Sequence, residues 1–296
     1  MLLATESIRP LALTNGLLQL GLFALVVCWP TWKTGRMSYV DIGWPWGLVF
    51  IGLLTFGFRF AEANEMRLAM VCGLYLAIGG RMGFYAVMLW RAGALNRELA
   101  RYRYQALRWE RAGVTNVALA RQVEVLVQGL ANASFLAFPA FVIAFNPASG
   151  VTGLELLGFS LALISLVLES LADRQKAAFV AQSKAKGQRD LVCDVGLWRY
   201  SRHPNYFFEW MVWNGLILMA MPAVPELFKS QPIPVAVLLT LGLLFVSRLM
   251  YQTLVHYTGA RPSEYYSLQK RPAYAEYQRR TNRFFPGPSK DLGTES

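Results

Sequence analysis

The stretch LALTNGLLQLGLFALVVCWPTW, residues 11–32, runs for 22 positions without a charged side chain. A helix needs about 20 apolar residues to cross the hydrocarbon of a bilayer, which is about 30 Å thick. A backbone in lipid must also satisfy its own hydrogen bonds, so this stretch is predicted to form a transmembrane helix. Six further apolar runs of comparable length follow it: Asp41–Phe58, Leu68–Trp90, Val123–Phe145, Leu154–Leu171, Tyr206–Met221 and Val235–Val255.

The composition agrees with this reading, because 55% of the 296 residues are hydrophobic, more than in an ordinary soluble domain. Neither a soluble module nor an internal repeat stands out between the apolar runs. The chain is therefore predicted to be an all-α, polytopic membrane protein with about seven transmembrane helices and ordered cytosolic loops. It is expected to form a single membrane domain over residues 1–296.

The positive charge is distributed unevenly. If the seven runs alternate in direction, 23 of the 29 Lys and Arg residues lie on one side of the membrane. The positive-inside rule then places the N-terminus outside and the C-terminus in the cytoplasm. Because the basic face lies next to the membrane plane, anionic lipid headgroups are expected partners and nucleic acid is not. The opposite side receives only Arg9, Arg59, Arg67 and Lys229.

Several charged residues fall within the apolar runs. Arg81 lies near the middle of the third run, among glycines that would permit close approach to its backbone, and Tyr85 follows one turn later on the same face. Asp41 opens the second run. Charges in lipid are costly and are functional candidates by default, although they can also pair with each other to hold helices together. Glu124 and Glu155, near run ends, are predicted to be solvated or interfacial.

The densest group of chemically capable residues is RYSRHPNY, residues 199–206. Arg199 and Arg202 can hold phosphates through charge-assisted hydrogen bonds, and Pro204 suits the first turn of a helix whose N-terminus attracts anions. Asn205 can bind an amide, and tyrosines can flank a planar ring. These residues predict a site for a large anionic ligand with aromatic rings, such as a dinucleotide. No GxGxxG motif follows a strand, so the site would not be of the Rossmann type.

Two connecting segments are predicted to be helical. Arg97–Trp109 reads as a basic amphipathic helix lying along the membrane surface. Tyr274–Arg280 reads as a helical turn with Tyr274 and Tyr277 on one face. With only two histidines in the chain and no cysteine or carboxylate at ligand spacing, a metal centre is not expected.

The run LWRYSRHPNYFFE, residues 197–209, resembles the steroid 5α-reductase family, in particular its bacterial members of the DUF1295 type. The segments 40–44, 102–108 and 271–281 agree with it, so the resemblance covers about residues 41–286. The Arg-His-Pro-x-Tyr core alone is less specific. Isoprenylcysteine carboxyl methyltransferases and NADPH-dependent sterol reductases have a similar segment.

The resemblance implies a bacterial inner-membrane enzyme that binds NADPH from the cytosolic side. Its substrate would be a steroid or isoprenoid enone that enters from the bilayer. The reaction would be reduction of the C4–C5 double bond of a 3-oxo-Δ4-steroid by hydride transfer. Asp41 matches the acidic position of the family on the second helix. The matching tyrosine is either Tyr85 or Tyr75, and Tyr85 is preferred because it shares a face with Arg81.

The same resemblance assigns most of the cofactor site, and electrostatics adds arginines for the phosphates. The residues carried over from the family are Asp173, Tyr200, Asn205, Glu209, Tyr274, Tyr277 and Arg280. The additions are Arg81, Arg91, Arg97, Arg103, Arg199, Arg202, His203 and Tyr206.

The sequence also leaves two other functional classes of protein open. An S-adenosylmethionine-dependent membrane methyltransferase of the isoprenylcysteine carboxyl methyltransferase type could use the same cytosolic pocket. Its cofactor carries no phosphate, so the arginine-rich loops favour the reductase. A non-enzymatic lipid-binding or scaffold protein would bind no nucleotide specifically.

Overall fold

The computed structural model describes residues 8–58, 63–188 and 190–290, and every regular element in these ranges is a helix. Seven helical runs in these ranges are long and apolar enough to cross a membrane, which confirms the predicted fold class and each predicted span. Arg59 and Arg189, which belong to the predicted charge distribution, lie outside the described residues. The seven runs are Arg9–Thr34, Val40–Gly57, Glu65–Arg91, Val117–Phe145, Gly153–Ala185, Pro204–Ser230 and Ile233–Lys270.

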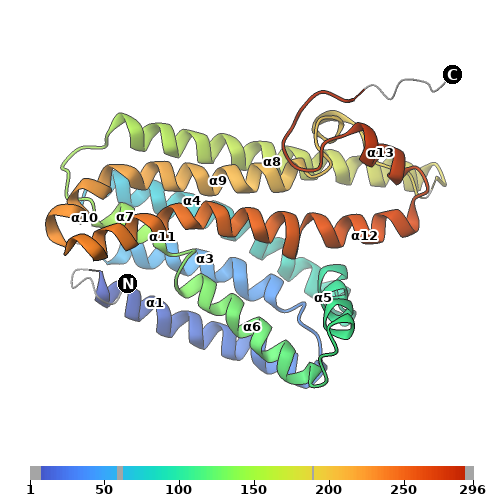
Figure 1. Cartoon of the computed structure of the whole chain (residues 1–296), viewed down its shortest axis with the longest axis horizontal. Coiled ribbons are helices and arrows are strands. Elements are labelled where there is room, and N and C mark those ends of the chain that lie inside the picture. Colours follow the sequence, from blue (N-terminus) through green and yellow to red (C-terminus); the bar gives the residue numbers. More distant parts are fainter. Residues whose placement is uncertain (1–7, 59–62, 189, 291–296) are drawn as a thin grey trace. The chain divides into compact units, whose positions relative to one another are not determined.

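Shorter helices complete the chain, and two of the long runs contain a wider turn. The π-helical turns Phe23–Cys28 and Thr253–Tyr257 join α1 to α2 and α11 to α12. The α-helices in Figure 1 are α1 (Arg9–Leu22), α2 (Trp29–Thr34), α3 (Val40–Gly57), α4 (Glu65–Arg91), α5 (Ala100–Arg111), α6 (Val117–Ala133), α7 (Phe138–Phe145), α8 (Gly153–Ala185), α9 (Pro204–Ala220), α10 (Val224–Ser230), α11 (Ile233–Gln252), α12 (Ala260–Lys270) and α13 (Tyr274–Arg280).

The chain divides into two compact units. Unit 1 comprises Met1–Ser160 and Asn214–Ser247, and unit 2 comprises Leu161–Trp213 and Arg248–Ser296. The boundaries therefore fall inside α8, α9 and α11. Each unit is described by itself below, and the single membrane domain stays a prediction.

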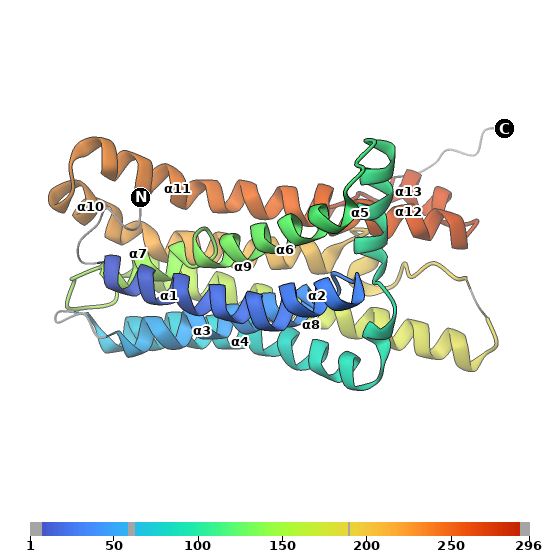
Figure 2. The same cartoon turned by 90° about the horizontal axis from the view of Figure 1, so that it is seen from below.

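In unit 1, α3 and α4 lie side by side and meet through glycines (Figure 2). A Cβ at Gly83 would lie 3.0 Å from Trp46 Nε1, and one at Gly52 would lie 2.8 Å from Tyr75 Cβ. Small residues let helix backbones approach closely in lipid, where burial of apolar surface does not itself drive association. The predicted close approach at the glycines around Arg81 is confirmed, and the group that approaches is helix α3.

A polar network crosses unit 1 within its membrane-spanning helices. Gln19 Nε2 donates to the Gly47 carbonyl at 2.9 Å, and Asn132 Nδ2 donates to the Trp44 carbonyl at 3.0 Å. Asn15 Nδ2 donates to the Ala133 carbonyl at 3.2 Å. Buried amides in a membrane interior need partners inside the protein, so these bonds fix α1, α3 and α6 relative to one another.

A buried ion pair holds the loop before α8. Arg67 Nε donates to Glu155 Oε1 at 2.5 Å, and both residues have 0% exposure. The remaining guanidinium nitrogens donate to the carbonyls of Asn146, Ala148 and Gly150. Of the two predicted roles of Glu155, solvated or interfacial, the solvated one is wrong, because Arg67 compensates its charge inside the protein. The interfacial position stays a prediction.

This pair makes the loop sensitive to one substitution. Arg67→Met should lower the free energy of unfolding by about 3–5 kcal/mol, because it leaves the Glu155 carboxylate buried without its counter-charge. Reversible denaturation in detergent measures the change.

Two further variants give the controls. Adding Glu155→Gln to Arg67→Met should recover part of the loss. Lys229→Met, which removes a cation 75% exposed, should cost less than about 1 kcal/mol. Equal stability of Arg67→Met and wild type would contradict the role assigned to the pair.

Candidate active site

The signature segment, residues 196–206, leads into α9. It begins with a 3₁₀ turn, Gly196–Arg199, and α9 starts at Pro204 as predicted. Gly196 has φ +56°, and a Cβ there would overlap the side chain of Gln175 on α8. Gln175 Oε1 accepts from the Leu197 amide at 2.9 Å. The turn therefore needs a glycine, and it ties the signature segment to α8 within unit 2.

Arg202 and His203 face the inside of unit 2. Arg202 Nε donates to Glu264 Oε1 on α12 at 2.8 Å, and its Nη1 donates to the carbonyls of Gln278 and Thr281 at 2.6 and 2.8 Å. His203 Nε2 lies 3.3 Å from the same Glu264 oxygen. Arg202 is 7% exposed and His203 is 2% exposed. The guanidinium thus satisfies the open carbonyls at the end of α13.

The tail segment, residues 281–287, is bound to the signature segment by further bonds. The Arg202 amide donates to the Asn282 carbonyl at 2.9 Å, and the Gly287 amide donates to the Tyr200 carbonyl at 3.0 Å. Ser201 Oγ donates to the Phe284 carbonyl at 2.9 Å. The Phe284 ring then packs 5.2 Å, between centroids, from that of Tyr251.

These contacts define a structural role for several predicted ligands of the cofactor. Tyr277 is buried on α13 and donates its hydroxyl to the Trp198 carbonyl at 2.5 Å, and Tyr274 packs against it. Burial raises the pKa of both phenols, which stay neutral. Because the polar atoms of Arg202, His203 and Tyr277 are engaged internally, the contacts favour an anchoring role over the predicted direct binding of a phosphate.

Asn205 and Asp173, which the resemblance assigns to the cofactor site, form a hydrogen bond with each other. Asn205 Nδ2, in the first turn of α9, donates to Asp173 Oδ1 on α8 at 3.0 Å. The other amide atom, Asn205 Oδ1, is buried and has no hydrogen-bond partner among the described residues. A buried acceptor without a donor is costly, so this atom is suited to receive an N–H group of a ligand. Glu209 follows one turn later on α9.

Three of the remaining predicted residues of unit 2 lie in the signature segment, and the fourth, Arg280, ends α13. Arg199 and Tyr200 are exposed, and Tyr206 stacks on His203 with 5.4 Å between ring centroids. Arg280 forms an ion pair with Asp194. Arg199 and Tyr200 therefore keep accessible side chains for a ligand, whereas Arg280 already has a counter-charge.

In unit 1, α5 confirms the predicted amphipathic helix and runs across the direction of α1, α3 and α4 (Figure 2). The loop before it is fixed by Glu98, which accepts from the Met37 and Ser38 amides at 2.9 and 3.1 Å. This arrangement places Tyr102 against Asp41. The Tyr102 hydroxyl donates to Asp41 Oδ1 at 2.6 Å, and Arg101 Nη2 lies 3.5 Å from Asp41 Oδ2.

Tyr102 is a candidate that sequence reasoning missed. Its side chain is 4% exposed and packs among Phe23, Val27 and Met37. Burial raises its pKa well above the usual range, and the negative charge of Asp41 adds to the shift. The hydroxyl therefore stays protonated and acts as a neutral hydrogen-bond donor. The sequence feature that could have identified Tyr102 is its position on the apolar face of the amphipathic helix α5.

Tyr85 and Tyr75, the two tyrosines predicted from the sequence to assist Asp41, have surroundings that differ from those of Tyr102. Tyr85 on α4 is 63% exposed, and Tyr75 donates its hydroxyl to the Leu136 carbonyl at 2.6 Å. Arg81 is partly buried on α4. The exposed arginines predicted to bind phosphate, Arg91, Arg97 and Arg103, lie at the end of α4 and on and before α5 in unit 1.

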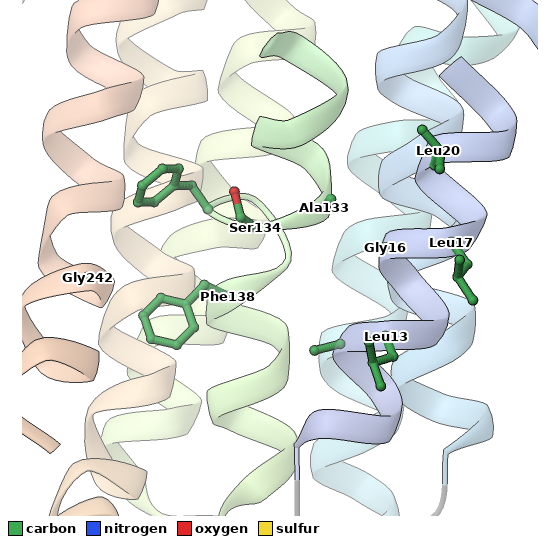
Figure 3. A pocket seen from close by; sticks show the side chains of 10 residues that line it. Leu13, Gly16, Leu17, Leu20, Ala133, Ser134, Phe138 and Gly242 are labelled. Carbon is green, nitrogen blue, oxygen red and sulfur yellow. The ribbon is translucent and has the colours of Figure 1, made fainter. Parts of the chain in front are cut away.

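An apolar cavity of about 470 Å³ lies within unit 1. Figure 3 shows Leu13, Leu17 and Leu20 along α1, with Ser134 and Phe138 on the chain where α6 ends and α7 begins. Gly242 of α11 also lines the cavity. A cavity of this volume matches the size of drug-like ligands, and its walls select an apolar one.

The helices and these clusters define a polytopic helical membrane protein with polar, partly buried side chains at the start of α3 and of α9. The chain belongs to the DUF1295 family, described as proteins of unknown function, whose model matches residues 28–281. No curated protein and no solved structure matches the chain.

The buried imidazole predicts a pH effect on stability. Burial lowers the pKa of His203 below its unfolded value of about 6.5, so folding favours the neutral imidazole. Its contribution is complete above about pH 6.5 and is lost as the pH falls toward the lower folded pKa. Melting temperatures between about pH 8 and about pH 5 should fall more steeply for wild type than for His203→Gln. Parallel curves for the two proteins would rule out this linkage.

Proposed function

We propose that the protein is an NADPH-dependent reductase of membrane-soluble enones, such as 3-oxo-Δ4-steroids or isoprenoid enones. The observation that carries the proposal is the Asp173–Asn205 pair, with Asn205 Oδ1 buried and lacking a donor. The family membership and the resemblance of residues 197–209 to steroid 5α-reductases support it.

The Asp173–Asn205 pair suits the carboxamide of a nicotinamide. Asp173 Oδ1 accepts from Asn205 Nδ2, and this bond fixes which end of the amide is left for a ligand. Asn205 Oδ1 then accepts a carboxamide N–H, and the exposed Tyr200 ring offers a surface for stacking. When bound, NADPH would supply a hydride to the β-carbon of the enone, and a proton from solvent would complete the α-carbon. The protein would orient the two partners.

Tyr102 is the proposed donor to the enone oxygen. As the double bond is reduced, the carbonyl oxygen gathers negative charge and needs a hydrogen-bond donor in a dry site. Tyr102 holds its proton at neutral pH because burial and Asp41 raise its pKa. In the structure the single phenolic proton is donated to Asp41 Oδ1 at 2.6 Å, so the enone oxygen would take the place of Asp41 as its acceptor. In this proposal Tyr102 replaces Tyr85 as the assisting tyrosine.

The apolar cavity of unit 1 is the proposed entrance for the substrate. Its leucine and phenylalanine walls favour a molecule that partitions into the bilayer. If the N-terminus lies outside, as the positive-inside rule predicts, the signature segment would face the cytosol, where NADPH is available.

Cofactor binding is tested by thermal stabilisation of the purified protein in detergent. At a concentration 100-fold above Kd, NADPH should stabilise the folded state by about 2.7 kcal/mol. Asn205→Leu should abolish most of this gain, and Asn96→Leu, which alters an exposed asparagine of unit 1, should not. Stabilisation by S-adenosylmethionine alone would replace the reductase with a methyltransferase. The absence of stabilisation by either cofactor would favour a non-enzymatic protein.

A pair of matched substitutions tests the donor. Tyr102→Phe should lower kcat for an enone by about 10²–10³-fold, because it removes the donor to the developing oxyanion. Tyr85→Phe should leave kcat within about two-fold, since its ring is 63% exposed. Binding of NADPH should be unchanged in both. The reverse order of effects on kcat would return the role to Tyr85.

A further inference from the structure

The apolar cavity of unit 1 has a recess in the wall that α1 forms. The volume of the cavity is about 470 Å³, and α1, the junction of α6 and α7, and α11 supply its lining. Ala12, Gly16 and Leu20 lie four residues apart along α1, so they share one face of the helix. Leu13 and Leu17 flank Gly16 on the same wall (Figure 3). The leucines therefore line the cavity on either side of a position that has no side chain.

Packing between helices does not account for Gly16. A Cβ at Gly47 would lie 2.1 Å from Asn132 Nδ2. One at Gly43 would lie 2.4 Å from Val27 Cγ2, so both of these glycines allow helices to touch. A Cβ at Gly16 would meet no neighbouring heavy atom of the described residues within 4 Å. Glycine inside a helix is less favourable than alanine, so Gly16 lowers helix stability without a gain in packing. The space beside it is open to a ligand.

Helix α1 connects the cavity to the proposed hydrogen-bond donor. Leu20 lines the cavity, and Phe23, three residues later, belongs to the apolar cluster that surrounds Tyr102. Because a helix rises by 1.5 Å per residue, Gly16 lies about 10 Å from Phe23 along the helix axis. A substrate whose enone oxygen is held by Tyr102 would therefore reach the level of Gly16 with the part of its body that is remote from the oxygen.

We propose that Gly16 is a specificity-determining residue, which admits lipids whose ring-containing or branched body is wider than an unbranched chain. This inference rests on the proposed function, because it assumes that the cavity receives the enone. A leucine at position 16 would extend the leucine wall and fill the recess, which leaves room only for a narrow chain. The selection is steric, because extra carbon atoms in a site without room for them force the ligand or the wall to shift.

The test compares two tritiated enones that share the reacting group and differ in width. Androstenedione has fused rings, and non-3-en-2-one has an unbranched chain. Kd for each is measured with the full chain in nanodiscs, and turnover of each is measured with NADPH. Gly16→Leu should raise Kd for androstenedione on the order of 10- to 100-fold and change Kd for non-3-en-2-one by less than about two-fold. Gly16→Ala, which adds one carbon, should have a smaller effect of the same kind.

Gly73 provides the matched control. It also lies inside a helix of unit 1, α4, it is exposed, and a Cβ there would meet no neighbouring atom of the described residues within 4 Å, but it does not line the cavity. Gly73→Leu should therefore keep both Kd values of wild type. Neither leucine variant should melt below wild type, because leucine favours a helix more than glycine does. A lower melting temperature for Gly16→Leu alone would show that position 16 is packed and would overturn the inference.

The outcomes separate this inference from the proposed function. If Gly16→Leu weakens binding of both enones equally, or of neither, selection by width is overturned, whereas turnover by wild type leaves the reductase standing. If wild type binds androstenedione but reduces neither enone, the reductase proposal fails. A selective loss of androstenedione binding in Gly16→Leu would then still support the role of Gly16. If wild type binds neither enone, the cavity is not an enone site and the inference is overturned.

Discussion

The buried guanidinium of Arg202 is the constraint on which unit 2 depends. It binds the Glu264 carboxylate of α12 and two carbonyls at the end of α13. A buried charge is tolerated only when its partners are close and its hydrogen bonds are complete. If α12 or α13 moved away, the Arg202 guanidinium would stay buried without those partners, so the three elements are held together. Each residue of RYSRHPNY then has a distinct task. Arg202 anchors the tail segment, and His203 lies beside Glu264. Pro204 starts α9, and Asn205 is left with an open acceptor.

The contacts of Arg202 and His203 show that side chains suited to ligand binding can instead stabilise the fold. Arginine and histidine beside a helix N-terminus suggest a phosphate site when only the sequence is considered. Inside unit 2 the Arg202 guanidinium satisfies carbonyls at the end of the short helix α13, and His203 Nε2 lies beside the Glu264 carboxylate. Whether a basic side chain is available to bind an anion is therefore better predicted from its ion-pair partners than from its position in a motif.

The fold was predictable from the sequence because its signals are local. Apolar length predicts spans, and Pro204 and the periodicity of α5 and α13 depend on neighbouring residues only. The pairings were not predictable in this way. Arg67 meets Glu155 across 88 positions, Tyr102 meets Asp41 across 61, and Arg202 meets Glu264 across 62. Sequence spacing states which face of a helix a residue shares, as for Tyr85 and Arg81, but not whether that face looks inward. Asn205 was also chosen for its amide chemistry, whereas Asp173 was assigned to the cofactor site only through the family resemblance.

The most direct test of the account follows hydrogen exchange of backbone amides with and without NADPH. Exchange reports local opening, so a bound ligand slows it where the ligand is held. The account predicts slower exchange in residues 190–206 and 260–274 of unit 2, with the amides of α5 unchanged. Protection confined to α5 and the loop before it, or no change anywhere, would contradict a dinucleotide site built on the signature segment.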